Sequence, residues 1–305
     1  MPLALRSHIE LPEPGGFDHA AVHRASGRLY VAHTSHGALD VIDCAAGRFL
    51  HPIPNLAGVA GALVSDEHNL VFTSNRGENA VGLFSPPDEG RLVKVPVGIR
   101  PNGLAYAPLH RLLLAANVGD PSRPGSYTVS LVDVPGRAMI ADLPAPGRTR
   151  WTTYHPKLDV FFVNIADPPQ IIVVEPSPPR IARAFPVPAA GPHGLDLDLE
   201  ADRLFCACDA GRLIVLDART GQIKAECDLA GAPDVIFFNP ALHHLYVAIG
   251  DPGLVEVYDT DSLDRLQTVT TEPGAHNLGF DLDRNQVYVF LPRSHRAAVY
   301  QDNAD

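Results

Sequence analysis

A repeated strand pattern runs through the whole chain and limits the fold more than any other feature. Each copy contains an alternating apolar stretch around one of seven residues: Tyr30, Phe72, Leu114, Phe162, Phe205, Tyr246 and Tyr288. Each copy then ends in a polar residue, at positions 43, 85, 133, 175, 217, 259 and 302, so the steps are 42, 48, 42, 42, 42 and 43 residues. Because such alternation is typical of half-buried strands, the pattern predicts seven units of four short strands.

Four-stranded units at this period predict an all-β protein, a seven-bladed β-propeller with four antiparallel strands in each blade. We expect a single domain over residues 1–305. The blades are expected to begin near Asp18, Ala60, Asn102, Arg150, His193, Asp234 and His276. The seventh copy ends at Asp302 with room for only three strands, whereas residues 5–11 resemble the last strand of the sixth copy. The N-terminal strand is therefore expected to complete the last blade and close the ring.

Two of the copies carry a family resemblance. Residues 28–43 read RLYVAHTSHGALDVID, and residues 244–260 contain HLYVAI and VEVYDT. These segments resemble the YVTN repeat, which implies a seven-bladed propeller. The family includes binding proteins, haem-d-type domains and lactonase-like enzymes, so the resemblance implies the fold more narrowly than the activity.

Composition excludes several classes of partner and cofactor. The chain has 24 Lys and Arg against 35 Asp and Glu, a net charge of −11, and no basic run, which argues against nucleic acid and anionic membranes as partners. No haem-attachment CxxCH motif and no glycine-rich nucleotide loop occurs, so we expect neither haem nor a nucleotide. The N-terminus lacks the pattern of a signal peptide and no apolar segment is long enough to span a membrane, so we expect a cytoplasmic protein.

The residues that open the innermost strands are expected to meet at one mouth of the axial channel. In an antiparallel blade, the first strand begins and the second strand ends at the same face. His193, Asp234 and His276 come from consecutive blades and offer two imidazoles and a carboxylate, a ligand set for a divalent metal ion. The alternative is that these residues only form tight turns, because Asn, Asp and Gly are common in turns and the Asn and Asp side chains form hydrogen bonds with the nearby backbone.

Further polar residues are expected at the same mouth. Asp18 or His19 would serve as a catalytic base, and Arg150 would hold a substrate carboxylate or a developing oxyanion across the mouth. The other residues expected to contact a substrate are Asn102, Trp151, Asn75 and Asn117. For Trp151, packing between blades is the alternative interpretation.

Two classes of function follow from this arrangement. The first is a metal-assisted hydrolase or lyase that acts on a small anionic or lactone substrate. As a candidate enzyme, the chain resembles the calcium-dependent lactonase propellers in its axial Asp and Asn residues, but those propellers have six blades. A metal-free variant of this hypothesis, similar to the carboxymuconate-lactonising propellers, would use His and Arg alone. The second is a non-catalytic scaffold whose mouth binds a ligand or a partner protein without turnover.

Overall fold

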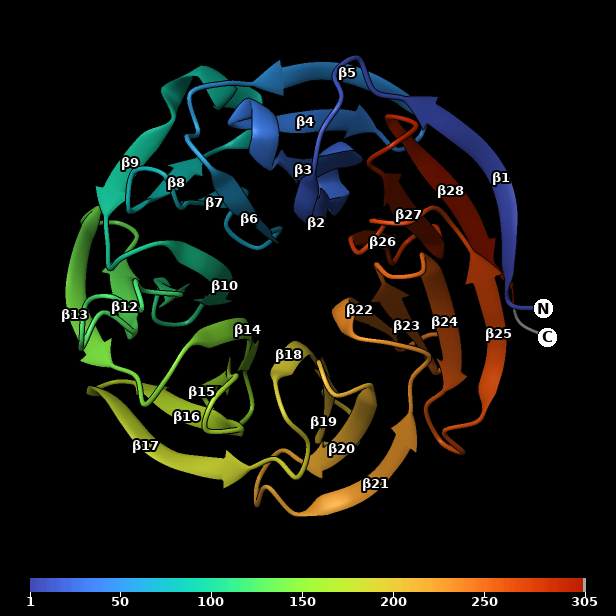
Figure 1. Cartoon of the computed structure of the whole chain (residues 1–305). Helices are drawn as coiled ribbons and strands as arrows, with labels where there is room; N and C mark the ends of the chain where they lie inside the picture. The colour runs from blue at the N-terminus through green and yellow to red at the C-terminus, as the bar shows by residue number, and fades with distance from the viewer. Residues whose placement is uncertain (304–305) are drawn as a thin grey trace.

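The computed structural model describes residues 1–303, which form a ring of seven four-stranded antiparallel sheets around an axis (Figure 1). From the axis outwards, the first three blades are β2 (Phe17–His23), β3 (Arg28–His33), β4 (Ala38–Asp43), β5 (Arg48–Ile53); β6 (Val59–Ser65), β7 (Leu70–Asn75), β8 (Ala80–Phe84), β9 (Val93–Pro96); and β10 (Pro101–Ala107), β11 (Leu112–Asn117), β12 (Thr128–Asp133), β13 (Ala138–Pro144). The next two are β14 (Thr149–His155), β15 (Val160–Ile165), β16 (Gln170–Pro176), β17 (Pro179–Pro186); and β18 (Pro192–Asp198), β19 (Arg203–Cys208), β20 (Arg212–Asp217), β21 (Ile223–Asp228). The last two are β22 (Pro233–Asn239), β23 (His244–Ile249), β24 (Leu254–Asp259), β25 (Arg265–Thr270); and β26 (Leu278–Asp281), β27 (Gln286–Leu291), β28 (Arg296–Asp302), β1 (Leu3–Glu10). The predicted seven-bladed propeller is therefore confirmed.

Helical structure in residues 1–303 is limited to three short 3-10 segments, at Arg24–Ser26, Thr34–His36 and Pro86–Arg91. No helix in this part of the chain has the length and apolar character needed to cross a membrane.

The N-terminal strand closes the ring, as the repeat count predicts. β1 pairs antiparallel with β28 from Leu3 opposite Asp302 to Glu10 opposite Arg296, so the strand lies two residues earlier at its start than the predicted segment 5–11. The backbone N–H of Leu11 extends this contact by donating to the carbonyl of His295 at 2.8 Å. Pro2 and Asn303 lie side by side, with the backbone N–H of Asn303 donating to the carbonyl of Pro2 at 3.0 Å, where β1 and β28 meet at the rim (Figure 1). Pairing of β1 covers the edge that β28 would otherwise expose.

Of the seven innermost strands, all except β26 carry a bulge close to the axial mouth. Six of them begin one residue before the predicted position, whereas β26 begins at Leu278, two residues after the predicted His276. In β2, Phe17 pairs with His33 and Ala20 with Val31, so one strand has an extra residue between these pairs. Such a bulge changes the direction of the side chains beside it.

Glycines next to the mouth allow the innermost strands to pack backbone against backbone. A Cβ added to Gly103 would lie 2.5 Å from the carbonyl oxygen of Arg150, and one added to Gly194 would lie 2.4 Å from that of Asp234. Neither glycine has a positive φ. The Pro-Asn-Gly and Pro-His-Gly segments therefore serve close strand contact and not the tight turns considered from the sequence.

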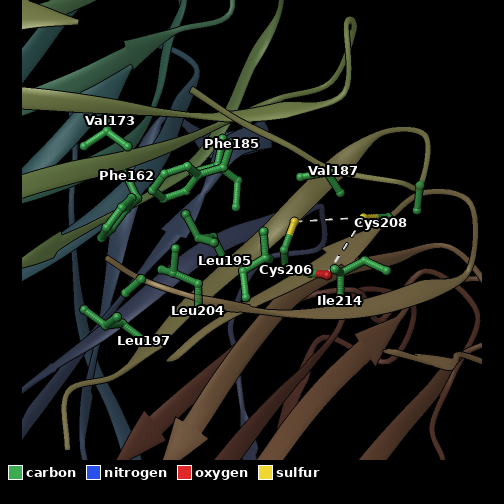
Figure 2. Packing of buried hydrophobic residues seen from close by; sticks show 14 of the residues in the cluster. Phe162, Val173, Phe185, Val187, Leu195, Leu197, Leu204, Cys206, Cys208 and Ile214 are labelled. Carbon is green, nitrogen blue, oxygen red and sulfur yellow. Dashed lines mark hydrogen bonds between the residues drawn. The ribbon is translucent and has the colours of Figure 1, made fainter. Parts of the chain in front are cut away.

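The hydrophobic core consists of layers between neighbouring blades. Figure 2 shows Phe162 and Phe185 of the fourth blade packed toward Leu195 and Leu204 of the fifth. Cys206 joins this layer, and its sulfur lies 3.9 Å from that of Cys208, another buried free thiol. All seven repeat residues of the second strands have no more than 1% exposure: Tyr30, Phe72, Leu114, Phe162, Phe205, Tyr246 and Tyr288. The alternating sequence pattern thus belongs to strands whose blade is covered on both faces by the neighbouring blades.

Candidate functional site

The axial mouth holds a linked group of charged side chains. We call Arg150, His193, Asp209, Asp234 and His276 the mouth cluster; the first four come from three consecutive blades, and His276 lies two residues before β26. The predicted trio of His193, Asp234 and His276 is brought together. Arg150, expected across the mouth, lies instead beside His193, because β14 and β18 are adjacent in the ring.

His193 is at the centre of this cluster. Its Nδ1 lies 2.7 Å from Oδ1 of Asp209, and its Nε2 lies 3.1 Å from Oδ1 of Asp234. Arg150 places Nη1 3.0 Å from the same Nε2 and donates through Nη2 to Oδ2 of Asp209 at 3.2 Å. In the imidazolium form, both ring N–H groups of His193 therefore face carboxylates.

The charges of this cluster are set by the balance of burial against pairing. Burial favours the neutral imidazole of His193, but the carboxylates of Asp234 and Asp209 outweigh it and raise the pKa of His193 to about 9. Burial also opposes ionisation of Asp234, yet the two imidazoles hold the pKa of this carboxyl well below its usual range. The pKa of Asp209 is lowered as well, because pairing with His193 and Arg150 outweighs its desolvation. At neutral pH the centre is a charged His193 between two carboxylates.

His276 differs from His193 in having one ring nitrogen without a protein partner. Its Nδ1 lies 2.8 Å from Oδ2 of Asp234, and no hydrogen bond from a residue in the range 1–303 reaches its Nε2. The side chain is 38% exposed. The hydrogen bond to Asp234 is the largest of the effects that raise the pKa of His276. Asp234 therefore fixes one side of the ring and leaves the other side open to a molecule in the mouth.

Asp18 and His19, the predicted bases, have other partners. Asp18 places Oδ2 3.2 Å from Nη2 of Arg76, and Oδ1 3.3 Å from Nε2 of His19. His19 is almost completely buried, and this burial lowers its pKa. Its ring stacks on Trp151, with centroids 4.2 Å apart. Because β2 and β14 belong to the first and fourth blades, this pair, which we call the His19–Trp151 floor, crosses the axis beneath the mouth cluster.

The predicted substrate-binding amides lie deeper than expected. Asn75 and Asn117 are fully buried, and Asn117 donates to the hydroxyls of Thr128 and Ser130 on β12. A Cβ added to Gly82 would lie 3.6 Å from Nδ2 of Asn75, so this amide also lies against the neighbouring strand of its own blade. Asn102 is 7% exposed, and its Oδ1 is buried without a hydrogen-bond donor in the described chain.

The side chains do not present a metal site. Within residues 1–303, no group of three or more His, Cys, Asp and Glu residues is arranged to hold a metal ion. Both ring nitrogens of His193 are occupied by Asp209, Asp234 and Arg150, and a metal ligand needs an unprotonated nitrogen. The geometry thus does not fit the expected ligand set of His193, Asp234 and His276, and the metal ion stays a prediction from the sequence.

Two residues of the mouth were not chosen from the sequence as site residues. Asp209 and Arg76 follow the second strands β19 and β7, whose ends lie at the same face as the openings of the innermost strands. A position directly after a second strand therefore indicates, from the sequence alone, that a residue lies at the mouth face. It does not reveal which of the many polar residues there contact the axial residues, because that depends on the length and direction of each side chain.

Comparisons with known proteins support the fold. No protein-family model matches the chain, and no curated protein matches its sequence, so the YVTN resemblance rests on the repeat residues. A solved structure titled Kuenenia stuttgartiensis hydrazine synthase is similar, with a TM-score of 0.82, 12% identity and coverage of 97% of each chain. A chain from a crystal structure of the mitotic checkpoint complex has a TM-score of 0.83 and 10% identity, covering 99% of this chain and 92% of that one. At these identities, the similarity establishes a propeller fold that different proteins use.

Proposed function

We propose that the axial mouth binds a small anionic molecule and transfers a proton to or from it without a metal ion. The observation that carries this proposal is the Asp234–His276 pair, in which Nδ1 of His276 lies 2.8 Å from Asp234 and Nε2 has no partner among residues 1–303. A carboxylate that orients a histidine in this way prepares the opposite nitrogen for general acid or base catalysis.

Three arginines near the start of neighbouring innermost strands support an anionic ligand. Arg100 directly precedes β10, Arg148 directly precedes β14, and Arg150 is the second residue of β14. Burial and then the positive charges of Arg150 and Arg100 lower the pKa of Arg148. Asp209 offsets only part of this charge. A carboxylate on the ligand would relieve the repulsion and pair with a guanidinium through two hydrogen bonds.

The best-supported reaction is hydrolysis of a lactone or ester that bears a carboxylate. Nε2 of His276 would remove a proton from a water molecule as the water oxygen forms a bond to the carbonyl carbon. The ring C–O bond then breaks, and the leaving oxygen takes the proton back from His276. Asp234 would stabilise the imidazolium form between these steps, and the arginines would hold the substrate carboxylate.

The test is hydrolysis of carboxylated lactones by protein treated with a chelator. We expect turnover that falls at least ~100-fold in His276→Gln, because a positioned acid or base contributes about 10²–10⁴-fold. Arg148→Gln should mainly raise KM. His8→Gln, on the exposed outer strand β1, is the matched control and should leave the rate unchanged. Turnover that survives in His276→Gln, or that needs added metal, contradicts the proposal.

A non-catalytic scaffold is the second candidate. The similar propeller from the structure titled mitotic checkpoint complex favours a scaffold, because that structure is a protein assembly. The repeat residues support placing the chain among the YVTN-type propellers. This candidate predicts that citrate or an acidic peptide binds at the mouth, that Arg150→Gln weakens binding, and that no lactone is hydrolysed. Calorimetric titration together with the hydrolysis assay separates the two functions.

A further inference from the structure

An apolar cavity lies on the axis beneath the His19–Trp151 floor. Its volume is about 180 Å³. Six blades contribute to its wall, which includes His19, Ala62, Leu63, Trp151, Phe237 and Phe280. All of the wall residues come after the mouth positions along the innermost strands, so the cavity extends from the floor away from the mouth cluster.

The cavity wall carries no net charge. His19 is the only titratable residue in it, and burial lowers the pKa of this imidazole, which keeps it neutral. In the fifth blade, both carboxylate oxygens of Asp196 accept hydrogen bonds from backbone N–H groups, one from Leu197 at 2.8 Å and one from Phe238 at 2.7 Å. Water would find few hydrogen-bond partners in such a space, and apolar cavities of about 150 Å³ bind a single aromatic ring.

Aromatic side chains form one side of the cavity. The rings of Trp151 and Phe237 meet edge to face, with centroids 6.3 Å apart. An aromatic ring packs favourably against the faces and edges of other aromatic rings, so this side of the wall favours an aromatic ligand.

We propose that this cavity binds a small uncharged aromatic molecule with a single ring. The ring would pack against Trp151, Phe237 and the aliphatic wall. This site is separate from the anionic mouth and does not depend on the function proposed there.

The intrinsic fluorescence of the full chain tests the proposal directly, because Trp151 is the only tryptophan. Excited at the red edge, where phenols absorb little, Trp151 should respond in a saturable way to p-cresol, and calorimetry should give the same affinity. Toluene, which has the same ring without the oxygen, should bind at least as tightly, because the contacts are apolar. Failure of both probes to bind overturns the cavity as a site, and much weaker binding of toluene than of p-cresol overturns recognition by apolar contact.

Substitutions place the binding in the cavity. Ala62→Leu adds volume to the wall and should weaken p-cresol binding at least tenfold, while Ala138→Leu, an exposed alanine on the outer strand β13, should leave it unchanged. If Ala62→Leu does not fold, Leu63→Ala replaces it: this variant enlarges the cavity and should admit 4-propylphenol, a larger ligand. Arg150→Gln at the mouth should retain binding. Binding that Ala62→Leu leaves intact, or that Arg150→Gln abolishes, contradicts the assignment.

Discussion

At His193, burial and charge act in opposite directions. Loss of solvent favours the neutral ring, whereas Asp234 at 3.1 Å and Asp209 at 2.7 Å favour the charged one, and the carboxylates prevail. At His276 the same carboxylate, Asp234, orients the ring through one nitrogen only. Two histidines one blade apart thus have different chemistry, because the first is held on both sides and the second on one.

Asp209→Asn tests this account of His193. The neutral amide removes one of the two negative charges beside the ring, so we expect the pKa of His193 to fall below its value of about 9. A titration followed by NMR of the imidazole nitrogens measures it. Asp264→Asn, at an exposed position in the loop before β25, is the control and should leave the pKa in place. An unchanged pKa in Asp209→Asn would mean that Asp234 alone sets the charge.

At the scale of strands, ring closure depends on a few side chains of β1. Ile9 is 2% exposed and packs in one layer with Leu11, Phe17 and Phe290, whereas Leu5 on the same strand is 51% exposed. The strand joins the first and last blades through this apolar layer as well as through its backbone pairing with β28. The apolar layer, and not strand length alone, gives the closure its stability.

Ile9→Ala should therefore destabilise the protein, while Leu5→Ala should not. Truncating a buried isoleucine removes apolar contacts and leaves a cavity, which costs roughly 2–5 kcal/mol. Truncating the exposed Leu5 should change the free energy of unfolding by less than about 0.5 kcal/mol. Chemical denaturation of both variants measures the difference. Equal effects would show that the backbone pairing alone carries the closure.

At the scale of the whole molecule, ring closure makes neighbours of residues that are distant in the chain. Asp18 influences the pKa of His276, although 258 positions separate them, because the first and seventh blades are adjacent. The mouth cluster itself joins residues of consecutive blades over positions 150–276, so it exists only when these blades are folded and packed together. Its protonation must therefore be linked to global unfolding.

Stability should fall as the pH rises from about 6.5 to about 9. His193 has a pKa of about 9 in the folded chain and an ordinary value of 6.5 when unfolded, so its contribution is complete below pH 6.5 and is lost by about pH 9. His276 has a raised pKa and adds to the same trend. We expect a loss of roughly 1–3 kcal/mol over this range. Urea denaturation at several pH values measures it.

His193→Gln should flatten this pH dependence, whereas His8→Gln on β1 should keep it. The carboxylates act in the opposite direction: the pKa values of Asp209 and Asp234 are lowered, so their contribution is lost as the pH falls through the acidic range. A stability curve that stays level from pH 6.5 to 9 would contradict the charged state assigned to His193.

The sequence by itself determined the number of blades and the set of residues around the axis. The 42-residue period specifies four short strands per unit, and closure by an N-terminal strand follows from the missing strand of the seventh copy. Ring symmetry then brings His193, Asp234 and His276 to one mouth, since equivalent positions in neighbouring blades lie side by side. These features depend only on spacing and alternation, which the chain displays directly.

Only the tertiary structure decided which of these residues contact one another. Asn75 and Asn117 end second strands at the mouth face, yet their amides lie against their own blades. His19 and Trp151 meet across the axis, and Arg150 lies 3.0 Å from Nε2 of His193, the ring nitrogen that faces Asp234. Such contacts depend on bulges, side-chain rotamers and the width of the channel. Those quantities arise from the packing of all seven blades together, and no local spacing encodes them.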